Sequence, residues 1–195
     1  SKDELTITGG TYTVTAARHG LSGNDSVAVA NGSFAITSGK DGIHAENADD
    51  ASKGFLYIAD GSFAVDAQGD AVSASGELQI DGGSYTLTAA GGADSSGMDF
   101  GFGKQDRFAA DGTCFITING GTITIVSDGD SIDSNGNLTV NGGTLDLTCS
   151  GNGNTAIDTN GTDANNGGDV TTNDGSESGT GGMGGEKPRG NGKED

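Results

Sequence analysis

The sequence is poor in several residue types that most proteins use freely. It contains no tryptophan, one proline and two cysteines among its 195 residues. No stretch approaches the ~18 consecutive apolar residues of a membrane-spanning helix, so we expect no membrane span. Only 9 Lys and Arg residues stand against 28 Asp and Glu, which gives a net charge of −19. Because nucleic acids and anionic membranes bind basic patches, the charge argues against both as partners and favours cations.

The cysteines and the start of the chain carry little information. Cys114 and Cys149 fall at different positions of the repeat described below, so we do not expect them to pair. The chain begins in the middle of a repeat without a signal peptide, and we interpret it as a fragment or a processed chain. The missing signal therefore says nothing about export.

Glycine is what the chain has in excess, with 38 residues, and it follows a pattern. A Gly-Gly or Asx-Gly turn recurs with its second glycine at steps of 22, 29, 22, 38 and 22 residues. Each turn lies between two short segments of alternating apolar residues, as in Leu78-x-Ile80 before Gly82-Gly83 and Tyr85-x-Leu87 after it. Such alternation indicates short strands with one buried face, and a fixed period near 20 indicates a solenoid. The turn glycines are Gly10, Gly32, Gly61, Gly83, Gly121 and Gly143.

A third apolar position follows in every repeat, and a glycine corner then leads to the next repeat in most of them. Three strands and three corners per 22 residues predict an all-β, right-handed parallel β-helix of about six coils over residues 1–161, with apolar residues of the first two strands pointing inward. Residues 162–195 lose the periodicity and predict a disordered tail rich in Gly, Asn and Asp. The third positions are Leu21, Ile43, Val72, Met98, Ile132 and Ile157.

Two insertions lengthen the repeats at the same corner, after the third strand. One lies around residues 46–53 and the other between Met98 and Gly112. Insertions on one side of a solenoid often mark its binding face, although tolerated loop drift explains them equally well. The second insertion holds aromatic and basic residues that are scarce elsewhere, and aromatic rings stack on sugars while Lys and Arg pair with carboxylates. We therefore predict ligand binding there, with anchoring of the loop as the alternative; the residues are Phe100, Phe102, Lys104 and Arg107.

An acidic ladder gives the strongest signal for a metal. Asp99, Asp133 and Asp158 each follow the third apolar residue of their repeat, so in-register stacking places them ~5 Å apart. Calcium takes six to eight oxygen ligands and would relieve the repulsion, with Asp128 and Asp130 completing the shell. An exposed acidic stripe screened by salt is the alternative interpretation.

A second row of aspartates precedes the third apolar position by two residues in three repeats: Asp41, Asp70 and Asp130. We expect these side chains to bond their own backbone at a tight corner, in preference to binding metal. His19 and His44 are the only histidines and fall at different repeat positions. Neither has a partner at zinc-ligand spacing in the sequence, so we expect both to be ordinary surface residues.

The strand–Gly-Gly–strand repeat, the Asp-Gly-Ile and Asp-x-Ile corners and the Gly-Gly-Met-Gly-Gly tail resemble the bacterial carbohydrate-binding-domain family of extracellular β-helices. That family is similar in fold to pectate lyases, and the resemblance covers residues 5–161. It implies a calcium-associated protein of the bacterial cell surface that binds plant-type or acidic polysaccharides, including polyuronates, without cleaving them.

Two other classes stay open. Asp41-Gly42-Ile43 and Arg18-His19-Gly20 faintly resemble polygalacturonase strings, but they come in the wrong order and no R-x-K follows. A polysaccharide lyase needs an Arg or Lys base beside calcium, and Lys104 and Arg107 are the only basic residues near the predicted ladder. A passive adhesin or spacer, in which the repeat is the whole function, is the third class. The sequence does not determine the sugar or the oligomeric state.

Overall fold

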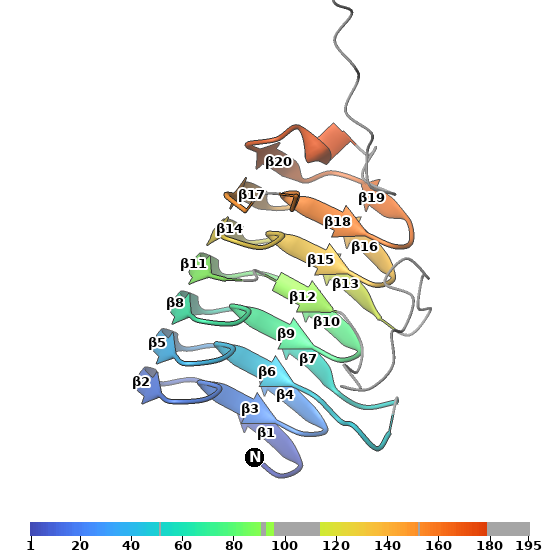
Figure 1. Ribbon diagram of the computed structural model, residues 1–195. Coiled ribbons are helices and arrows are strands. Elements are labelled where there is room, and N and C mark those ends of the chain that lie inside the picture. Colours follow the sequence, from blue (N-terminus) through green and yellow to red (C-terminus); the bar gives the residue numbers. More distant parts are fainter. Residues whose placement is uncertain (51, 91–92, 96–113, 152, 179–195) are drawn as a thin grey trace, which may run out of the picture.

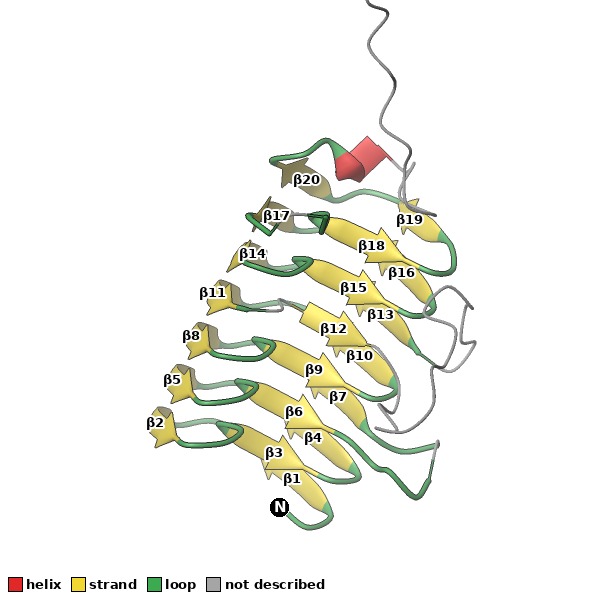
Figure 2. Ribbon diagram, viewed as in Figure 1, coloured by secondary structure: helices red, strands yellow, loops and turns green. Residues whose placement is uncertain are grey.

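The chain winds into a parallel β-helix in which each coil gives one strand to each of three sheets (Figures 1 and 2). The computed structural model describes residues 1–50, 52–90, 93–95, 114–151 and 153–178. All strand pairs between coils are parallel and in register. The predicted fold class, an all-β solenoid of about six coils, is confirmed.

We name the sheets A, B and C in the order in which the chain visits them. Sheet A consists of β1 (Glu4–Ile7), β4 (Ser26–Val29), β7 (Phe55–Ile58), β10 (Glu77–Ile80), β13 (Phe115–Ile118), β16 (Asn137–Val140) and β19 (Asp163–Asn165). Sheet B consists of β2 (Thr11–Ala16), β5 (Ser33–Ser38), β8 (Ser62–Ala67), β11 (Ser84–Ala89), β14 (Thr122–Ser127), β17 (Thr144–Cys149) and β20 (Asp169–Thr172). Sheet C consists of β3 (Leu21–Gly23), β6 (Ile43–Ala45), β9 (Val72–Ala74), β12 (Ala93–Ser95), β15 (Ile132–Ser134) and β18 (Ile157–Thr159).

The core is a column of apolar side chains enclosed by the three sheets. Strands of sheet B such as β5 and β8 alternate strictly between exposed and buried residues, as the period of two predicts. The residues predicted to point inward are buried, except that Leu5 and Val14 in the first coil are partly buried against the same cluster. The first coil has no coil below it, which explains their exposure. Both cysteines are buried, and no disulfide joins them.

Aromatic rings stack along part of this column. Tyr12, Phe34, Phe63 and Tyr85 occupy one position of successive sheet B strands, and their ring centroids lie 5.0, 4.7 and 4.9 Å apart with nearly parallel planes. The parallel register imposes this spacing, because residues one coil apart are separated by the ~4.8 Å between strands. The tyrosine hydroxyls at both ends donate hydrogen bonds to Gly9 O and Gly82 O of their own turns.

In the first six coils the second glycine of the turn between sheets A and B has a positive φ, from +94° at Gly143 to +147° at Gly32. Its carbonyl accepts a hydrogen bond from the first residue of the sheet B strand in the next coil, as in Thr144 N donating to Gly121 O at 2.9 Å. A Cβ on Gly121 would lie 2.9 Å from Gly83 O. Glycine is therefore required by both its conformation and its contact with the coil below.

Two sequence predictions need correction. The third strand of coil 4 is formed by Ala93–Ser95 and not around Met98, because the small Ala93 pairs with Val72 and Ile132. The stack also continues past residue 161, where β19 and β20 pair with β16 and β17. These two strands bury little apolar surface, so the hydrophobic pattern does not reveal them. Asn166 Nδ2 donates to Asn141 Oδ1 and helps to hold this last coil.

The described residues contain one helical element, the 3-10 turn η1 (Ser176–Ser178), and no helix among them could cross a membrane. Residues 179–195 of the predicted tail lie outside the described residues.

Replacement of Gly121 by alanine is expected to destabilise the protein by about 1–3 kcal/mol, because a side chain is strained at this φ of +102° and approaches Gly83 O. Urea unfolding followed by far-UV circular dichroism measures the change. Gly9→Ala is the matched control, since nothing lies within 4 Å of its added Cβ, and should change stability by less than about 0.5 kcal/mol. Equal effects of the two substitutions would contradict this role of the turn glycine.

Candidate functional site

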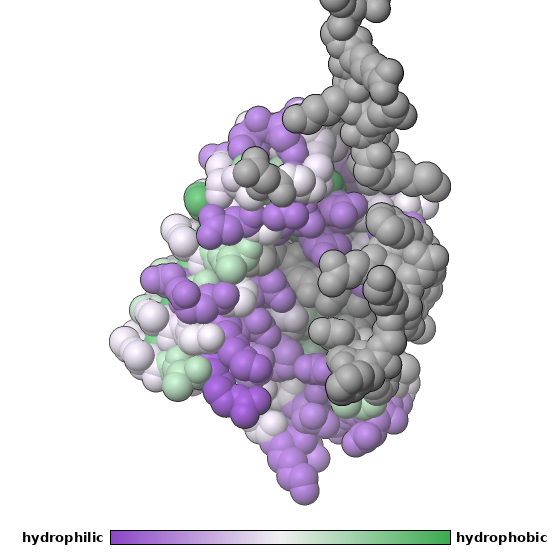
Figure 3. Space-filling view, viewed as in Figure 1, coloured by the Kyte–Doolittle hydropathy of each residue, from purple (hydrophilic) through white to green (hydrophobic). Residues whose placement is uncertain are grey.

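The outer face of sheet C carries polar side chains in the middle position of β3, β6, β9, β15 and β18, from Ser22 to Asp158. This face is turned toward the viewer in Figure 3, where hydrophilic residues cover it. The insertion around residues 46–53 leaves the body next to this face, between β6 and β7, while residues 96–113 of the other insertion lie outside the described residues. The predicted sites are therefore expected on or beside sheet C.

The acidic ladder exists in part. Asp133 and Asp158 are register partners in β15 and β18, as predicted. The backbone partner of Asp133 in coil 4 is Asp94 and not Asp99, because β12 begins at Ala93. Asp99 lies outside the described residues. The predicted row thus runs through residues 94, 133 and 158 of the backbone.

The two aspartates predicted to complete a calcium shell accept hydrogen bonds from the backbone and side chains of the next coil. Asp128 Oδ1 accepts a hydrogen bond from the Ser150 hydroxyl at 2.9 Å. Asp130 Oδ1 accepts one from Thr155 N. Burial raises the pKa of Asp130, and the charges of Asp158 and Asp174 raise it further. Asp130 therefore lies in an environment that disfavours its negative charge.

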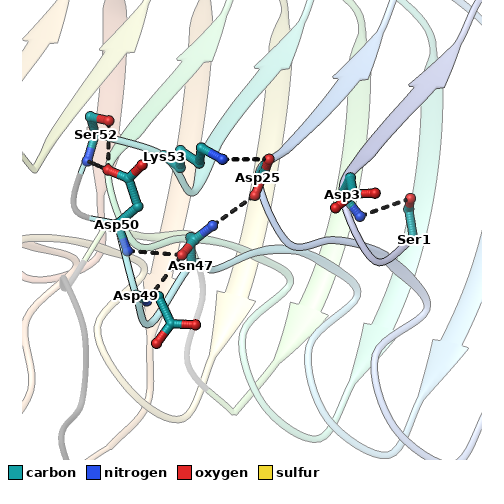
Figure 4. Close-up of polar contacts among 8 residues, drawn as sticks. All are labelled: Ser1, Asp3, Asp25, Asn47, Asp49, Asp50, Ser52 and Lys53. Carbon is teal, nitrogen blue, oxygen red and sulfur yellow. Dashed lines mark hydrogen bonds and ion pairs between the residues drawn. The ribbon is translucent and has the colours of Figure 1, made fainter.

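The predicted ligand-binding residues Phe100, Phe102, Lys104 and Arg107 lie outside the described residues, so their role stays a prediction. The other insertion, between β6 and β7, is tied to the coil below it (Figure 4). Asn47 Nδ2 and Lys53 Nζ donate to the two oxygens of Asp25 at 2.7 and 2.8 Å. Asn47 Oδ1 accepts hydrogen bonds from the amides of Asp49 and Asp50. This insertion is thus a closed, internally bonded loop.

A cluster that the sequence analysis missed lies at the other end of sheet C. His19, from the β2–β3 turn, stacks on His44 of β6 with ring centroids 3.9 Å apart and planes at 14°. Nδ1 of His19 and Nδ1 of His44 lie 3.0 and 2.8 Å from the same atom, Asp41 Oδ2. Both Nδ1 atoms are buried, and neither has a hydrogen bond of acceptable angle to any described residue. The expectation that the two histidines are ordinary surface residues was therefore wrong.

The surroundings fix the charges of this cluster. Burial lowers the pKa of His19 below its usual value, and the neighbouring His44 lowers it further, so that His19 is neutral at pH 7. Burial alone would raise the pKa of Asp41, but contacts with His44, with the Asp70 amide and with His19 together hold it below its usual range. The cluster at neutral pH thus contains an ionised carboxylate facing a neutral imidazole.

Asp41 also has a structural role. Its Oδ1 accepts a hydrogen bond from Asp70 N at 3.0 Å, which lies one coil further on. Asp130 bonds Thr155 N of its next coil in the same way. The predicted structural role of this row is present, but the partner of each of these two carboxylates is the next coil and not its own backbone.

A shallow pocket of about 300 Å³ opens beside the cluster. His19 and His44 form part of its wall together with Arg18, Ser22, Asn24 and Glu46. Among the described residues, His19, Asp41 and His44 form the one group of three potential metal ligands whose atoms all lie within 4.8 Å of one another. The four predicted calcium ligands that the structure describes, Asp128, Asp130, Asp133 and Asp158, do not form such a group.

The outer face of sheet B has a different character. From β2 to β17 its outward residues form three rows across the coils, and only Asp66 and Asp146 in them are charged. One row consists entirely of hydroxyl side chains: Thr11, Ser33, Ser62, Ser84, Thr122 and Thr144. The other two rows mix threonine with Ala35, Ala64 and Val126. A depression of about 350 Å³ lies on this face over β2, β5, β8 and β11.

The family of the chain follows from a comparison with family models. Residues 1–153 match the model of the carbohydrate-binding domain-containing protein family, which is most of the β-helix. The chain belongs to this family. Comparison with curated proteins and with solved structures returned no match. The matched region ends before β18, so it includes the histidine cluster and the sheet B face up to β17 but not Asp158.

Sequence spacing could have revealed part of what was missed. His44 lies 25 residues after His19, three more than one repeat, because His19 lies in the β2–β3 turn whereas His44 lies in the strand β6. The repeat length alone therefore does not predict their contact. The low charge of sheet B is visible in the sequence, because from β2 to β17 all its alternate residues except Asp66, Val126 and Asp146 are Ser, Thr or Ala in a chain of net charge −19.

Replacement of Asp41 by alanine is expected to destabilise the protein by about 1–3 kcal/mol, since it leaves the amide of Asp70 without its acceptor and removes the carboxylate that both imidazoles face. Urea unfolding at pH 7 measures the change. Asp66→Ala removes the same charge from the exposed face of sheet B and should shift stability by less than about 0.5 kcal/mol. A small effect at position 41 would show that the cluster contributes nothing to the stacking of coils.

Proposed function

We propose that the protein is a non-catalytic polysaccharide-binding module that docks its polymer on the outer face of sheet B. The family supports carbohydrate binding in general. The observation that carries the choice of surface is the flat array of hydroxyl and methyl groups from β2 to β17 in a strongly acidic chain. Charged side chains would bind water tightly and resist docking, whereas this face has only two of them.

The chemistry of the array suits sugars. Serine and threonine hydroxyls both donate and accept hydrogen bonds, as sugar hydroxyls do. The methyl groups of Thr, Ala35 and Ala64 can pack against the apolar faces of pyranose rings. The side chains within each row repeat every ~4.8 Å along the axis, so a polymer would make many similar weak contacts at once. Multivalent binding of this kind needs no deep pocket.

The same face offers little for cleavage. Glycoside hydrolysis by a carboxylate pair needs the two groups roughly 5–9.5 Å apart. Asp66 in β8 and Asp146 in β17 are separated by three coil steps, or about 14 Å along the axis, and also lie in different rows. This spacing supports binding without bond cleavage on sheet B.

The finer proposal concerns acidic polymers and calcium. Uronates are repelled by a chain of net charge −19 unless a cation bridges the two, and the acidic corner around Asp133, Asp158 and Asp130 is where calcium would concentrate. An acidic polymer would thus make a second contact beyond sheet B, in which Lys104 and Arg107 of the insertion after β12 meet uronate carboxylates directly. On this proposal the module acts at the bacterial cell surface on plant-type or acidic polysaccharides.

Glutamate at two adjacent positions of sheet B is expected to weaken polysaccharide retention at least tenfold. Ala35 and Ala64 are register partners on the exposed face, so Ala35→Glu with Ala64→Glu places two solvated charges in the array. Affinity electrophoresis and pull-down on insoluble glucans, xylans and pectins measure the loss. The matched control is Thr6→Glu with Ala28→Glu, an adjacent outward pair on sheet A that changes net charge equally.

Two outcomes would contradict this surface. Equal loss in the sheet A control would mean that net charge and not the sheet B face governs retention. Failure of the wild-type chain to bind any polysaccharide would favour the passive spacer, and release of unsaturated uronates would move the protein to the lyases.

Millimolar calcium is expected to raise the melting temperature of the wild-type chain, because an ion that binds only the native state stabilises it. Asp130→Asn tests the site. Without calcium the variant should melt at a higher temperature than the wild type, since it removes a charge disfavoured by burial, Asp158 and Asp174 while Oδ1 can still accept from Thr155 N. With calcium the wild type should gain more than the variant. An unchanged melting temperature of the wild type would refute the calcium proposal.

A further inference from the structure

We propose that His19, Asp41 and His44 form a binding site for a divalent transition-metal ion of the zinc class. One ligand atom from each of the three residues lies within 4.8 Å of the other two. We assign the ligand atoms as Nδ1 of both histidines, which lie 3.0 and 2.8 Å from Asp41 Oδ2, and Oδ2 itself. The site links coil 1 to coil 2, because His19 precedes β3 while Asp41 and His44 belong to the following coil.

The distances are close to those of a metal site. Zinc bonds of about 2.0–2.2 Å at tetrahedral angles place neighbouring ligand atoms about 3.4 Å apart. The two Nδ1–Oδ2 distances are 3.0 and 2.8 Å, so each has to open by roughly half an ångström to admit the ion. Side-chain rotation of this size leaves the backbone register unchanged.

The ligand atoms lack the partners that a purely structural cluster would give them. Two Nδ1 atoms converge on one carboxylate oxygen, and both are buried without a properly directed hydrogen bond to a described residue. Buried polar nitrogens of this kind call for an explanation. An ion between the three atoms would satisfy both nitrogens and the carboxylate oxygen together.

The other atoms of two ligands are held in the way that metal ligands usually are. His44 Nε2 lies 3.2 Å from Glu46 Oε2, so a carboxylate orients the imidazole and leaves Nδ1 for the ion. Asp41 Oδ1 is fixed by the Asp70 amide at 3.0 Å, which leaves Oδ2 for the ion. The arrangement is therefore set by groups outside the three ligands.

The chemistry of the donors selects the metal. Two imidazole nitrogens and one carboxylate oxygen suit zinc, copper, nickel and cobalt, whereas calcium prefers six to eight oxygens. Three protein ligands leave a coordination position for water or an external ligand. The adjoining pocket, with Arg18 and Ser22 in its wall, provides space for such a ligand.

Zinc titration of metal-stripped protein without a histidine tag tests the site. Isothermal titration calorimetry should show one zinc bound per chain at micromolar concentration. His19→Gln with His44→Gln should lower zinc affinity by more than the ~10–100-fold expected for loss of an outer partner. Glu46→Gln should produce that ~10–100-fold loss, because it removes the carboxylate that orients His44. Asp66→Asn, which changes charge on the distant sheet B, is the control and should bind as the wild type does.

A second readout does not depend on the fold of the variants. The chain has two histidines only, so long-range proton–nitrogen spectra of the wild type contain two imidazoles. Zinc should shift Nδ1 of both, and cobalt should give the intense visible absorption of a four-coordinate site. Equal zinc affinity in the double variant, or imidazole resonances unmoved by stoichiometric zinc, would overturn the proposal. Polysaccharide retention is a separate measurement, so either proposal can fail without the other.

Discussion

The structure depends on the hydrogen bond that each turn glycine accepts from the coil above. Gly10, Gly32, Gly61, Gly83, Gly121 and Gly143 all use their carbonyls in this way, and all adopt a positive φ. From the second coil onward, a side chain at these positions would meet the backbone of the coil below. This contact fixes the axial spacing and the register together, so every other ladder in the molecule follows from it: the aromatic column, the hydroxyl rows and the asparagines that bond from coil to coil.

The sequence was sufficient for the fold because the fold is local and repetitive. Alternating apolar residues around a Gly-Gly turn specify the strands, and the period specifies the stacking, as the buried Leu78, Ile116 and Leu138 show. Prediction failed where the pattern is weak. The pattern predicts the third strand of coil 4 at the more apolar Met98, whereas the strand begins at Ala93. The strands β19 and β20 are not predicted, because backbone pairing without apolar burial leaves no periodic signal in the sequence.

The candidate sites were harder to predict for a physical reason. A solenoid brings together residues that are one coil apart, but turns of different length shift the alignment by several residues. His19 and His44 are three residues out of step with the 22-residue period, yet their rings stack. Asp133 and Asp158 are also 25 residues apart, and their shared strand position could be recognised from the flanking Ile and Ser or Thr. Strand residues can thus be aligned from sequence, whereas corner residues need coordinates.

The aromatic column makes the two ends of the solenoid differ in their spectroscopic properties. Its rings occupy coils 1 to 4, and the same position is filled by Ile123 and Leu145 in coils 5 and 6. The chain has no tryptophan, and its three tyrosines, Tyr12, Tyr57 and Tyr85, all belong to the first four coils. Intrinsic fluorescence therefore reports on the N-terminal end alone. Coils that separate from the C-terminal end would leave tyrosine fluorescence unchanged, while far-UV circular dichroism would record their loss.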